Sequence, residues 1–202
     1  NVAQDGQLPA NFLKRRAAAY QAHYEFMPLP RMTMPRGPNA RMYRRLSYGP
    51  LANFLVLDGR QYRSDQPCGD GTKAPCQEFM KDGRTMLGSA QEGWIARELR
   101  GSRSQWNIIA NQVRMTVVDQ TPGPGESYSM DQSSGYDIAR KRFIAELVDS
   151  KVSNPIVITG DIHSNWVGDL KLDYREKRSA VVGTEFIGTS ISSGGDGSDT
   201  LP

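Results

Sequence analysis

The sequence predicts a protein of mixed α and β structure, of the α/β or α+β class, in which helices pack beside a sheet of buried strands. Short apolar runs bounded by turn residues alternate along the chain with longer segments whose apolar residues recur at helical spacing. The 20 Gly and 12 Pro residues also predict many turns and long connections. A loop-rich protein with a sheet is therefore favoured over a helical bundle.

Length and composition favour one domain. A chain of 202 residues with 38% hydrophobic residues can bury one sizeable core. We therefore expect residues 1–202 to belong to a single domain. The first residue is Asn, so we expect a processed or truncated N-terminus. The net charge is +3 and the basic residues are spread along the chain, so nucleic-acid binding is not predicted. No apolar run approaches the roughly 18–20 residues that span a bilayer, so a membrane span is not predicted either.

The first half of the chain contains signals for two helices and two strands. Pro9 suits a first helical turn, and Pro28 must end the helix that follows. Ser89 and Glu92 have the spacing of a capping box, which marks the start of a helix. The predicted elements are a helix over 9–27, neighbouring strands over 42–48 and 53–58, and a helix over 89–99.

The second half continues the alternation. Residues 121–135 contain few apolar side chains, so we expect a mobile loop that can act as a lid. The other predicted elements are a strand-like run over 106–118 that is interrupted at Asn111 and Gln112, where the chain bends or presents amides, a helix over 136–150, and strands over 155–159, 167–172, 180–186 and 189–193.

Cys68 and Cys76 are the only cysteines, and a turn-rich loop separates them. One interpretation is a short-loop disulfide, and the other is two free thiols in a reducing cytosol. Neither cysteine has the spacing of a zinc finger. We favour an exported protein.

The segment Gly160-Asp161-Ile162-His163 follows an apolar strand. In an extended chain, residues two apart point to the same side, so Asp161 and His163 are candidates for one metal site. A carboxylate suits a hard cation and an imidazole suits a transition metal. The alternative is an Asp that caps a turn beside a His that faces solvent, and the residues alone weight the two interpretations equally.

Several longer segments, in this order, resemble the alkaline phosphatase D family. They are FLVLDGRQYRSDQPCGDG (54–71), GSAQEGWIARELRGSRSQWNIIANQVRM (88–115), GDIHSNWVGDL (160–170) and GTEFIGTSISSGGDG (183–197).

This resemblance implies a calcineurin-like metallophosphoesterase fold, a β-sandwich flanked by helices, of which the chain is the C-terminal part. It also implies ferric iron and calcium as cofactors, with His163 as an iron ligand, Asp161 on a neighbouring metal, and Asn165 supporting the same shell. The implied reaction is hydrolysis of phosphate monoesters or diesters by a metal-activated oxygen, without a side-chain nucleophile, in a secreted or periplasmic enzyme.

Arg60 and Gln112 are the candidates for substrate binding, and Arg63 lies close to Arg60 in the chain. Arg60 follows a buried strand and can pair with phosphate, as can Arg63; the alternative is that both pair with Asp58 or Asp65. Gln112 can donate to a phosphate or a metal-bound water, or can be a satisfied buried amide.

The family pattern also requires acidic, Asn and His ligands that these 202 residues do not contain. The resemblance places them in a preceding half of the chain, which becomes a predicted partner of this one. Two or three ligands cannot satisfy iron and its calcium neighbours. The alternative functions are a phospholipase D-like phosphodiesterase and a non-catalytic binding fragment.

Overall fold

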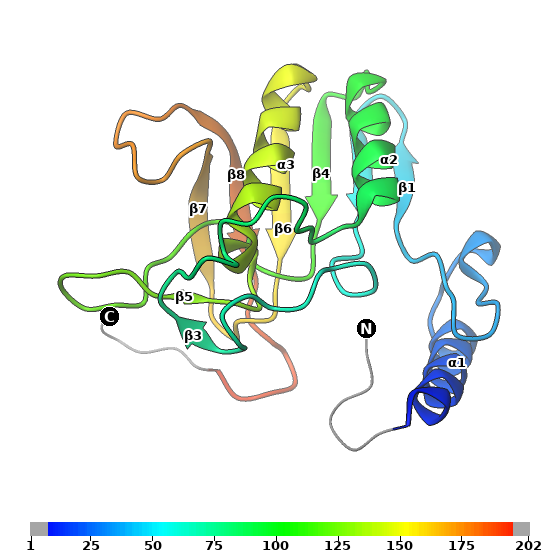
Figure 1. Ribbon diagram of the computed structural model, residues 1–202. Helices are drawn as coiled ribbons and strands as arrows, with labels where there is room; N and C mark the ends of the chain where they lie inside the picture. Colours follow the sequence, from blue (N-terminus) through cyan, green and yellow to red (C-terminus); the bar gives the residue numbers. More distant parts are fainter. Residues whose placement is uncertain (1–7, 196–202) are drawn as a thin grey trace. The chain divides into compact units, whose positions relative to one another are not determined.

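The computed structural model describes residues 8–195. Its contacts divide the chain into two compact units, and the division falls between Arg44 and Arg45. The first unit contains α1 (Pro9–Phe26) and a short 3-10 helix, η1 (Arg31–Thr33) (Figure 1). A proline in the first turn opens α1, and the chain leaves the helix at Met27, directly before Pro28, as predicted. Membership of all 202 residues in one domain stays a prediction.

The second unit is built on a mixed sheet of six strands. Neighbouring strands β2, β4, β6 and β8 run parallel, whereas β7 pairs antiparallel with β8. A separate antiparallel pair joins β3 (Thr72–Lys73) to β5 (Tyr128–Ser129). The order in the large sheet is β1 (Arg44–Tyr48), β2 (Ala52–Val56), β4 (Trp106–Ala110), β6 (Pro155–Thr159), β8 (Val181–Ile187) and β7 (Trp166–Lys171).

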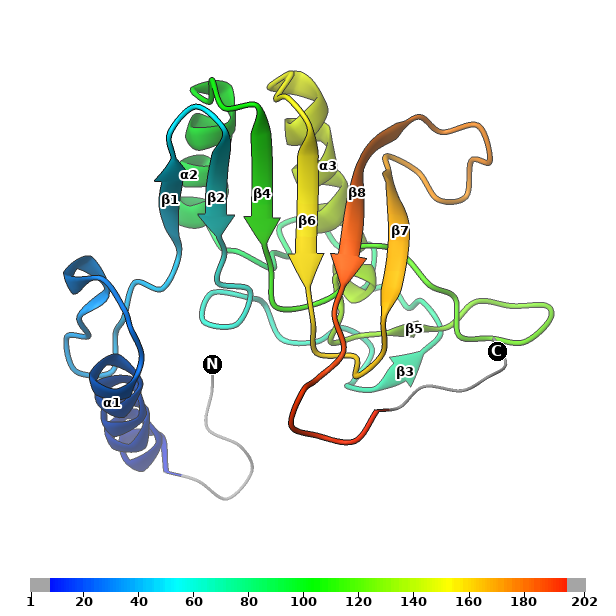
Figure 2. The same cartoon turned by 180° about the vertical axis from the view of Figure 1, so that it is seen from behind.

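Two helices, α2 (Ser89–Arg100) and α3 (Asp137–Asp149), lie on the same face of this sheet (Figures 1 and 2). Leu55, Ile109 and Val157 are in register on adjacent strands and are fully buried. The helices contribute buried Trp94, Ile95, Leu99, Phe143, Ile144 and Leu147. The core therefore lies between the sheet and the two helices, which confirms the predicted α/β class.

The opposite face of the sheet also carries apolar side chains. One row of residues in register crosses five strands: Val56, Ala110, Ile158, Phe186 and Val167. Their exposed fractions reach 40% at Ile158, 46% at Phe186 and 70% at Val167. Neither α2 nor α3 covers this row, which is unusual because parallel strands are normally buried on both faces.

The capping box predicted for Ser89 and Glu92 is wrong. Gly88 is the N-cap of α2, and no side chain caps the helix. Thr85 Oγ1 instead accepts hydrogen bonds from the backbone amides of Leu87 and Gly88. The carboxylate of Glu92 accepts from the Thr85 hydroxyl and from Arg142, so it is not available to the amide of Ser89.

The run predicted over 106–118 is a strand only up to Ala110, where β4 ends directly before the interruption expected at Asn111 and Gln112. The side-chain amide of Asn111 donates to the carbonyl of Val113, 2.7 Å away, and bends the chain. The backbone amides of Met115 and Thr116 then donate to the buried carboxylate of Glu185, each at 2.7 Å. A side chain from β8 therefore takes the hydrogen bonds that a neighbouring strand would otherwise accept.

The loop predicted over 121–135 is exposed only in its first part. Tyr128 is buried and stacks on Phe79 with ring centroids 5.9 Å apart, and Met130 completes a small apolar cluster. Residues 132–136 are buried, and most of them form the 3-10 helix η2 (Ser133–Tyr136). The expectation of a mobile loop is therefore wrong for the part from Tyr128 onward.

Cys68 and Cys76 form a disulfide, which decides between the two interpretations of the cysteines. Both half-cystines pack against the cluster of Phe79, Tyr128 and Met130. The strand predicted over 189–193 is absent from the described residues, whose last strand ends at Ile187. Among residues 8–195, no helix is both long enough and apolar enough to cross a bilayer.

Candidate active site

The predicted site residues gather at one edge of the large sheet. The loops after β2, β4 and β6 all leave from the carboxyl ends of parallel strands, and ligands of open α/β sheets bind outside these ends. Arg60 lies in the first of these loops, Gln112 in the second, and Asp161 in the third. The loop from β5 to α3 brings Asp131 and Gln132 to the same edge.

Asp161 and His163 have backbone φ angles of 74° and 51°, in the left-handed region. The segment after β6 is therefore not extended, and the prediction that strand alternation aligns the two side chains is wrong. Residues other than glycine rarely adopt such φ angles, and strained backbone of this kind occurs at binding and catalytic sites as well as in ordinary turns. The turn is closed by the amide of Ile162, which donates to the carbonyl of Gly160 at 3.0 Å.

The carboxylate of Asp161 is held from two sides. Gln132 Nε2 donates to its Oδ2 at 2.8 Å, and Arg60 Nη2 lies 3.6 Å from its Oδ1. The side chain of Asp161 still has an exposed fraction of 41%. This aspartate is therefore positioned by protein donors and also accessible from outside.

Asp131 anchors the arginines of the loop after β2. Arg60 Nη1 donates to both of its carboxylate oxygens, at 2.9 and 2.7 Å, and Arg63 Nη1 donates to Oδ1 at 2.7 Å. Gln66 adds a third donor at 3.0 Å. Burial raises the pKa of Asp131, but the hydrogen bonds and charges of Arg60 and Arg63 outweigh burial and lower this pKa below the ordinary Asp value.

Neither arginine makes the pairs considered from the sequence, with Asp58 or Asp65. Asp58 instead accepts hydrogen bonds from the backbone amides of Arg60 and Gln61, at 3.1 and 2.9 Å, and so caps the loop. The true partner, Asp131, is 71 residues from Arg60 along the chain. No local pattern marks that pairing, which is why sequence reasoning missed both Asp131 and Gln132.

Gln112 uses both ends of its side-chain amide on the backbone of the loop after β2. Its Oε1 accepts from the amide of Gly59, and its Nε2 donates to the carbonyl of Leu57, both at 2.7 Å. This geometry gives Gln112 the role of a clamp on the residues that precede Arg60. Its contact with substrate stays a prediction.

Asn165 lies at the far end of the same turn. Its side-chain oxygen accepts from the amide of Thr189 at 2.9 Å, which ties the turn to the segment after β8. His163 is half-buried between Asp161 and Asn165. The structure thus brings Arg60 beside Asp161, whereas the side chain of Asn165 is directed to backbone that follows β8.

The donor types in this turn suit a metal, since they include a carboxylate, an imidazole and an amide oxygen. The number of these donors, however, is too small to hold a metal ion. Within residues 8–195, no group of three or more His, Cys, Asp or Glu side chains is placed to hold a metal ion. The described residues therefore fit part of a metal site, in which the carboxylate of Asp161 is an accessible donor.

Two known proteins are similar to this chain over almost its full length. Alkaline phosphatase D of Bacillus subtilis (strain 168) is 42% identical over 198 residues, which cover 98% of this chain and 34% of that protein. A solved structure described as "Structure of PhoD" superposes with a TM-score of 0.91 at 43% identity, and it covers 98% of this chain and 38% of the solved chain. The chain thus spans little more than a third of these relatives. The family model described as PhoD-like phosphatase matches residues 2–201, and this chain belongs to that family.

Proposed function

We propose that this chain forms part of a metal-dependent phosphatase, and that the enzyme hydrolyses phosphate monoesters or diesters. The observation that carries the proposal is the turn at Asp161 and His163, which has left-handed backbone and an accessible carboxylate at the carboxyl edge of the sheet. The 42% identity with alkaline phosphatase D supports the same reaction class.

In this proposal His163 and Asp161 bind the metals, ferric iron and calcium, and Asn165 supports the same shell. Bound ions of this kind lower the pKa of a water molecule and neutralise charge on a phosphoryl group. Asp161 is suited to this role because Gln132 fixes one of its oxygens and leaves the carboxylate accessible. The half-buried position of His163 limits the orientations of its imidazole.

Arg60 is the proposed phosphate ligand of this chain. Asp131 holds its Nη1 in two hydrogen bonds, so the guanidinium plane is oriented before a substrate arrives. Nη2 lies 3.6 Å from Asp161, which is too far for a hydrogen bond. This nitrogen can therefore donate to a phosphoryl oxygen, and the positive charge of the group attracts a phosphate anion.

We further propose that the N-terminal half implied by the family resemblance supplies the remaining ligands and packs on the apolar row of the sheet. The exposed Ile158, Phe186 and Val167 support this packing, because soluble proteins rarely expose apolar side chains in one continuous row. The ligand set of residues 8–195, which is too small for a metal cluster, supports the need for further ligands.

The test uses the longest natural polypeptide that contains this chain and compares His163→Ala with His23→Ala. These are the two histidines of this 202-residue chain, and His23 is exposed on α1, so its substitution is a matched control. Iron and calcium content are measured by mass spectrometry, and hydrolysis is measured with p-nitrophenyl phosphate and bis(p-nitrophenyl) phosphate. The two substrates distinguish a monoesterase from a phosphodiesterase.

We expect His163→Ala to lose iron and to lower the rate by more than about 100-fold, since even residues behind the ligands contribute about 10- to 100-fold. His23→Ala should keep both properties. A metal-free wild-type protein that cleaves neither ester would contradict the proposal and favour a non-catalytic binding role.

An exported protein, secreted or periplasmic, is also proposed. The Cys68–Cys76 disulfide supports it, because such bonds persist in oxidising compartments. Thiol labelling of the protein taken directly from its native source tests this: two reactive thiols per chain would argue for a reducing compartment.

A further inference from the structure

The Cys68–Cys76 disulfide closes a short loop that contains β3. Strands β3 and β5 are each two residues long and pair side by side (Figure 1). Both residues of β3 are exposed, and an isolated pair of such short strands is only marginally stable in water. The disulfide restricts the loop around β3 and so helps to keep β3 paired with β5.

The disulfide also packs against the apolar cluster of Phe79, Tyr128 and Met130. Tyr128 belongs to β5, and its ring stacks on Phe79. The amide of Met130 donates to the carbonyl of Gly71, which lies inside the disulfide loop, at 2.9 Å. Asp131 follows directly in the chain. The carboxylate that holds the arginines is therefore attached, through the residue before it, to the loop that the disulfide closes.

The donors to Asp131 approach the disulfide from its other side. Three side chains donate to the carboxylate of Asp131, those of Arg60, Arg63 and Gln66. Gln66 precedes Cys68 by two residues. The disulfide thus borders both segments of this network, the one that donates and the one that accepts.

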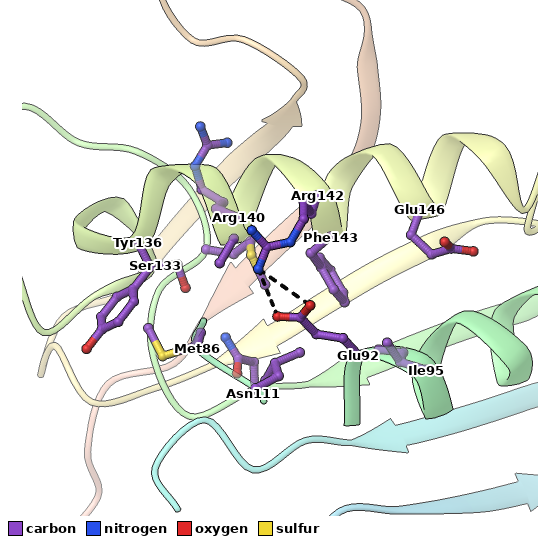
Figure 3. A pocket seen from close by; sticks show the side chains of 13 residues that line it. Met86, Glu92, Ile95, Asn111, Ser133, Tyr136, Arg140, Arg142, Phe143 and Glu146 are labelled. Atoms are coloured by element: carbon purple, nitrogen blue, oxygen red, sulfur yellow. Dashed lines mark hydrogen bonds and ion pairs between the residues drawn. The ribbon is translucent and has the colours of Figure 1, made fainter. Parts of the chain in front are cut away.

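The segment after Asp131 has a second attachment, which does not involve the disulfide. The buried 3-10 helix η2 begins two residues later, and its Ser133 and Tyr136 line a cavity between α2 and α3 (Figure 3). The Tyr136 hydroxyl donates to the carbonyl of Ser64 at 2.6 Å. This attachment holds the C-terminal side of Asp131 in the core, whereas its N-terminal side depends on the disulfide loop.

We propose that the Cys68–Cys76 disulfide positions Arg60 for phosphate, because it keeps Asp131 within hydrogen-bond distance of the guanidinium. The inference rests on the proposed function, in which Arg60 binds a phosphate anion. With the disulfide open, the guanidinium loses its fixed acceptor and must be ordered when phosphate binds, which lowers the affinity. The bond between the two cysteines therefore serves the phosphate site in addition to the stability of the fold.

The test measures the binding of inorganic phosphate by isothermal titration calorimetry, in the longest natural polypeptide that contains this chain. Wild type is compared with Cys68→Ser/Cys76→Ser, with Arg60→Gln, and with the variant that combines all three substitutions. We expect the serine pair to weaken phosphate binding about fivefold and Arg60→Gln to weaken it about tenfold, the order of magnitude of hydrogen bonds to a charged group. The combined variant should bind no more weakly than Arg60→Gln, because the disulfide acts through this arginine.

Three results would overturn the inference while the proposed function stands. They are unchanged affinity in the serine pair, further weakening when the serine pair is added to Arg60→Gln, and loss of iron from the serine pair, which would place its effect at the metal. Iron content is therefore measured in all four proteins. A wild-type protein that binds no phosphate would overturn the proposed function and this inference together, whereas one that binds phosphate but cleaves neither ester would remove the reaction alone.

Reduction of the wild-type disulfide gives a second comparison, which decides the question if the serine pair does not fold. Cys68 and Cys76 are half-buried, so a small dithiol such as dithiothreitol can reach them. The two sulfurs take up two electrons and two protons, and dithiothreitol leaves as its cyclic disulfide. After removal of the reagent, reduced wild type should bind phosphate about fivefold more weakly, and a folded serine pair should not respond. Equal affinities of reduced and oxidised wild type would contradict the positioning role.

Discussion

Glu185 offers a direct test of how the loop after β4 is held. Its side chain is fully buried, and its two oxygens accept the amides of Met115 and Thr116, each at 2.7 Å, and the hydroxyl of Thr159 at 3.0 Å. Glu185→Gln keeps the shape of the side chain but replaces one accepting oxygen with an NH₂ group. At least one backbone amide then faces a donor inside the core.

The cost of Glu185→Gln follows from these contacts. Loss of a hydrogen bond to a charged group contributes about 1.5–3 kcal/mol, and an unsatisfied buried amide adds about 1–3 kcal/mol. We therefore expect the free energy of unfolding to fall by about 2.5–6 kcal/mol, a large part of the roughly 5–15 kcal/mol typical of a whole protein. Urea unfolding followed by circular dichroism measures the difference.

Glu176→Gln is the matched control, because Glu176 is exposed and its replacement should change the free energy of unfolding by less than about 0.5 kcal/mol. Hydrogen exchange gives a local measurement, in which the amides of Met115 and Thr116 should exchange faster in Glu185→Gln. A loss below about 1 kcal/mol, with unchanged exchange at these two amides, would show that Glu185 does not hold the loop.

Two further predictions concern the loops around the site. Asp131→Asn should destabilise the protein near neutral pH, because Arg60 and Arg63 lose their anionic partner. Since the folded pKa of Asp131 is lowered, its contribution is present above the unfolded value of about 3.9 and is lost as the pH falls through the folded value, so wild type and variant should converge in urea unfolding at low pH. Replacement of Cys68 and Cys76 by serine should lower the free energy of unfolding by about 2–3 kcal/mol, and reductant should then have no further effect. A gap between wild type and Asp131→Asn that widens in acid, or a serine variant as stable as wild type, would contradict these predictions.

Elements whose signals are local could be predicted from the sequence. The prolines around α1 limit that helix directly, and the apolar run 155–159 matches β6 residue for residue. The segment that contains Asp161 and His163 stands out in the sequence because its residue types are chemically distinctive, and its role as a metal site stays a prediction. The strand alternation used to align them failed, since both residues adopt left-handed backbone that no local rule specifies.

Features that depend on distant partners could not be predicted. The end of β4 at Ala110 is determined partly by Glu185, about 70 residues later along the chain. The pairing of Arg60 with Asp131 likewise has a sequence separation of 71 residues. In both cases a buried or half-buried carboxylate accepts hydrogen bonds from donors that are far away in the sequence. Many amides and arginines in the chain could donate equally well, and only the fold determines which of them lie within hydrogen-bond distance.

The clamp formed by Gln112 determines how Arg60 can move. The side-chain amide of Gln112 forms hydrogen bonds with the peptide groups on both sides of Asp58. Asp131, in the loop between β5 and α3, accepts hydrogen bonds from the guanidinium of Arg60. The backbone directly before Arg60 is therefore attached to the segment after β4, and the guanidinium is attached to the segment before α3. A displacement of this arginine must therefore shift two loops together, so under the proposed role of Arg60 the phosphate ligand is part of a rigid unit and not a single flexible side chain.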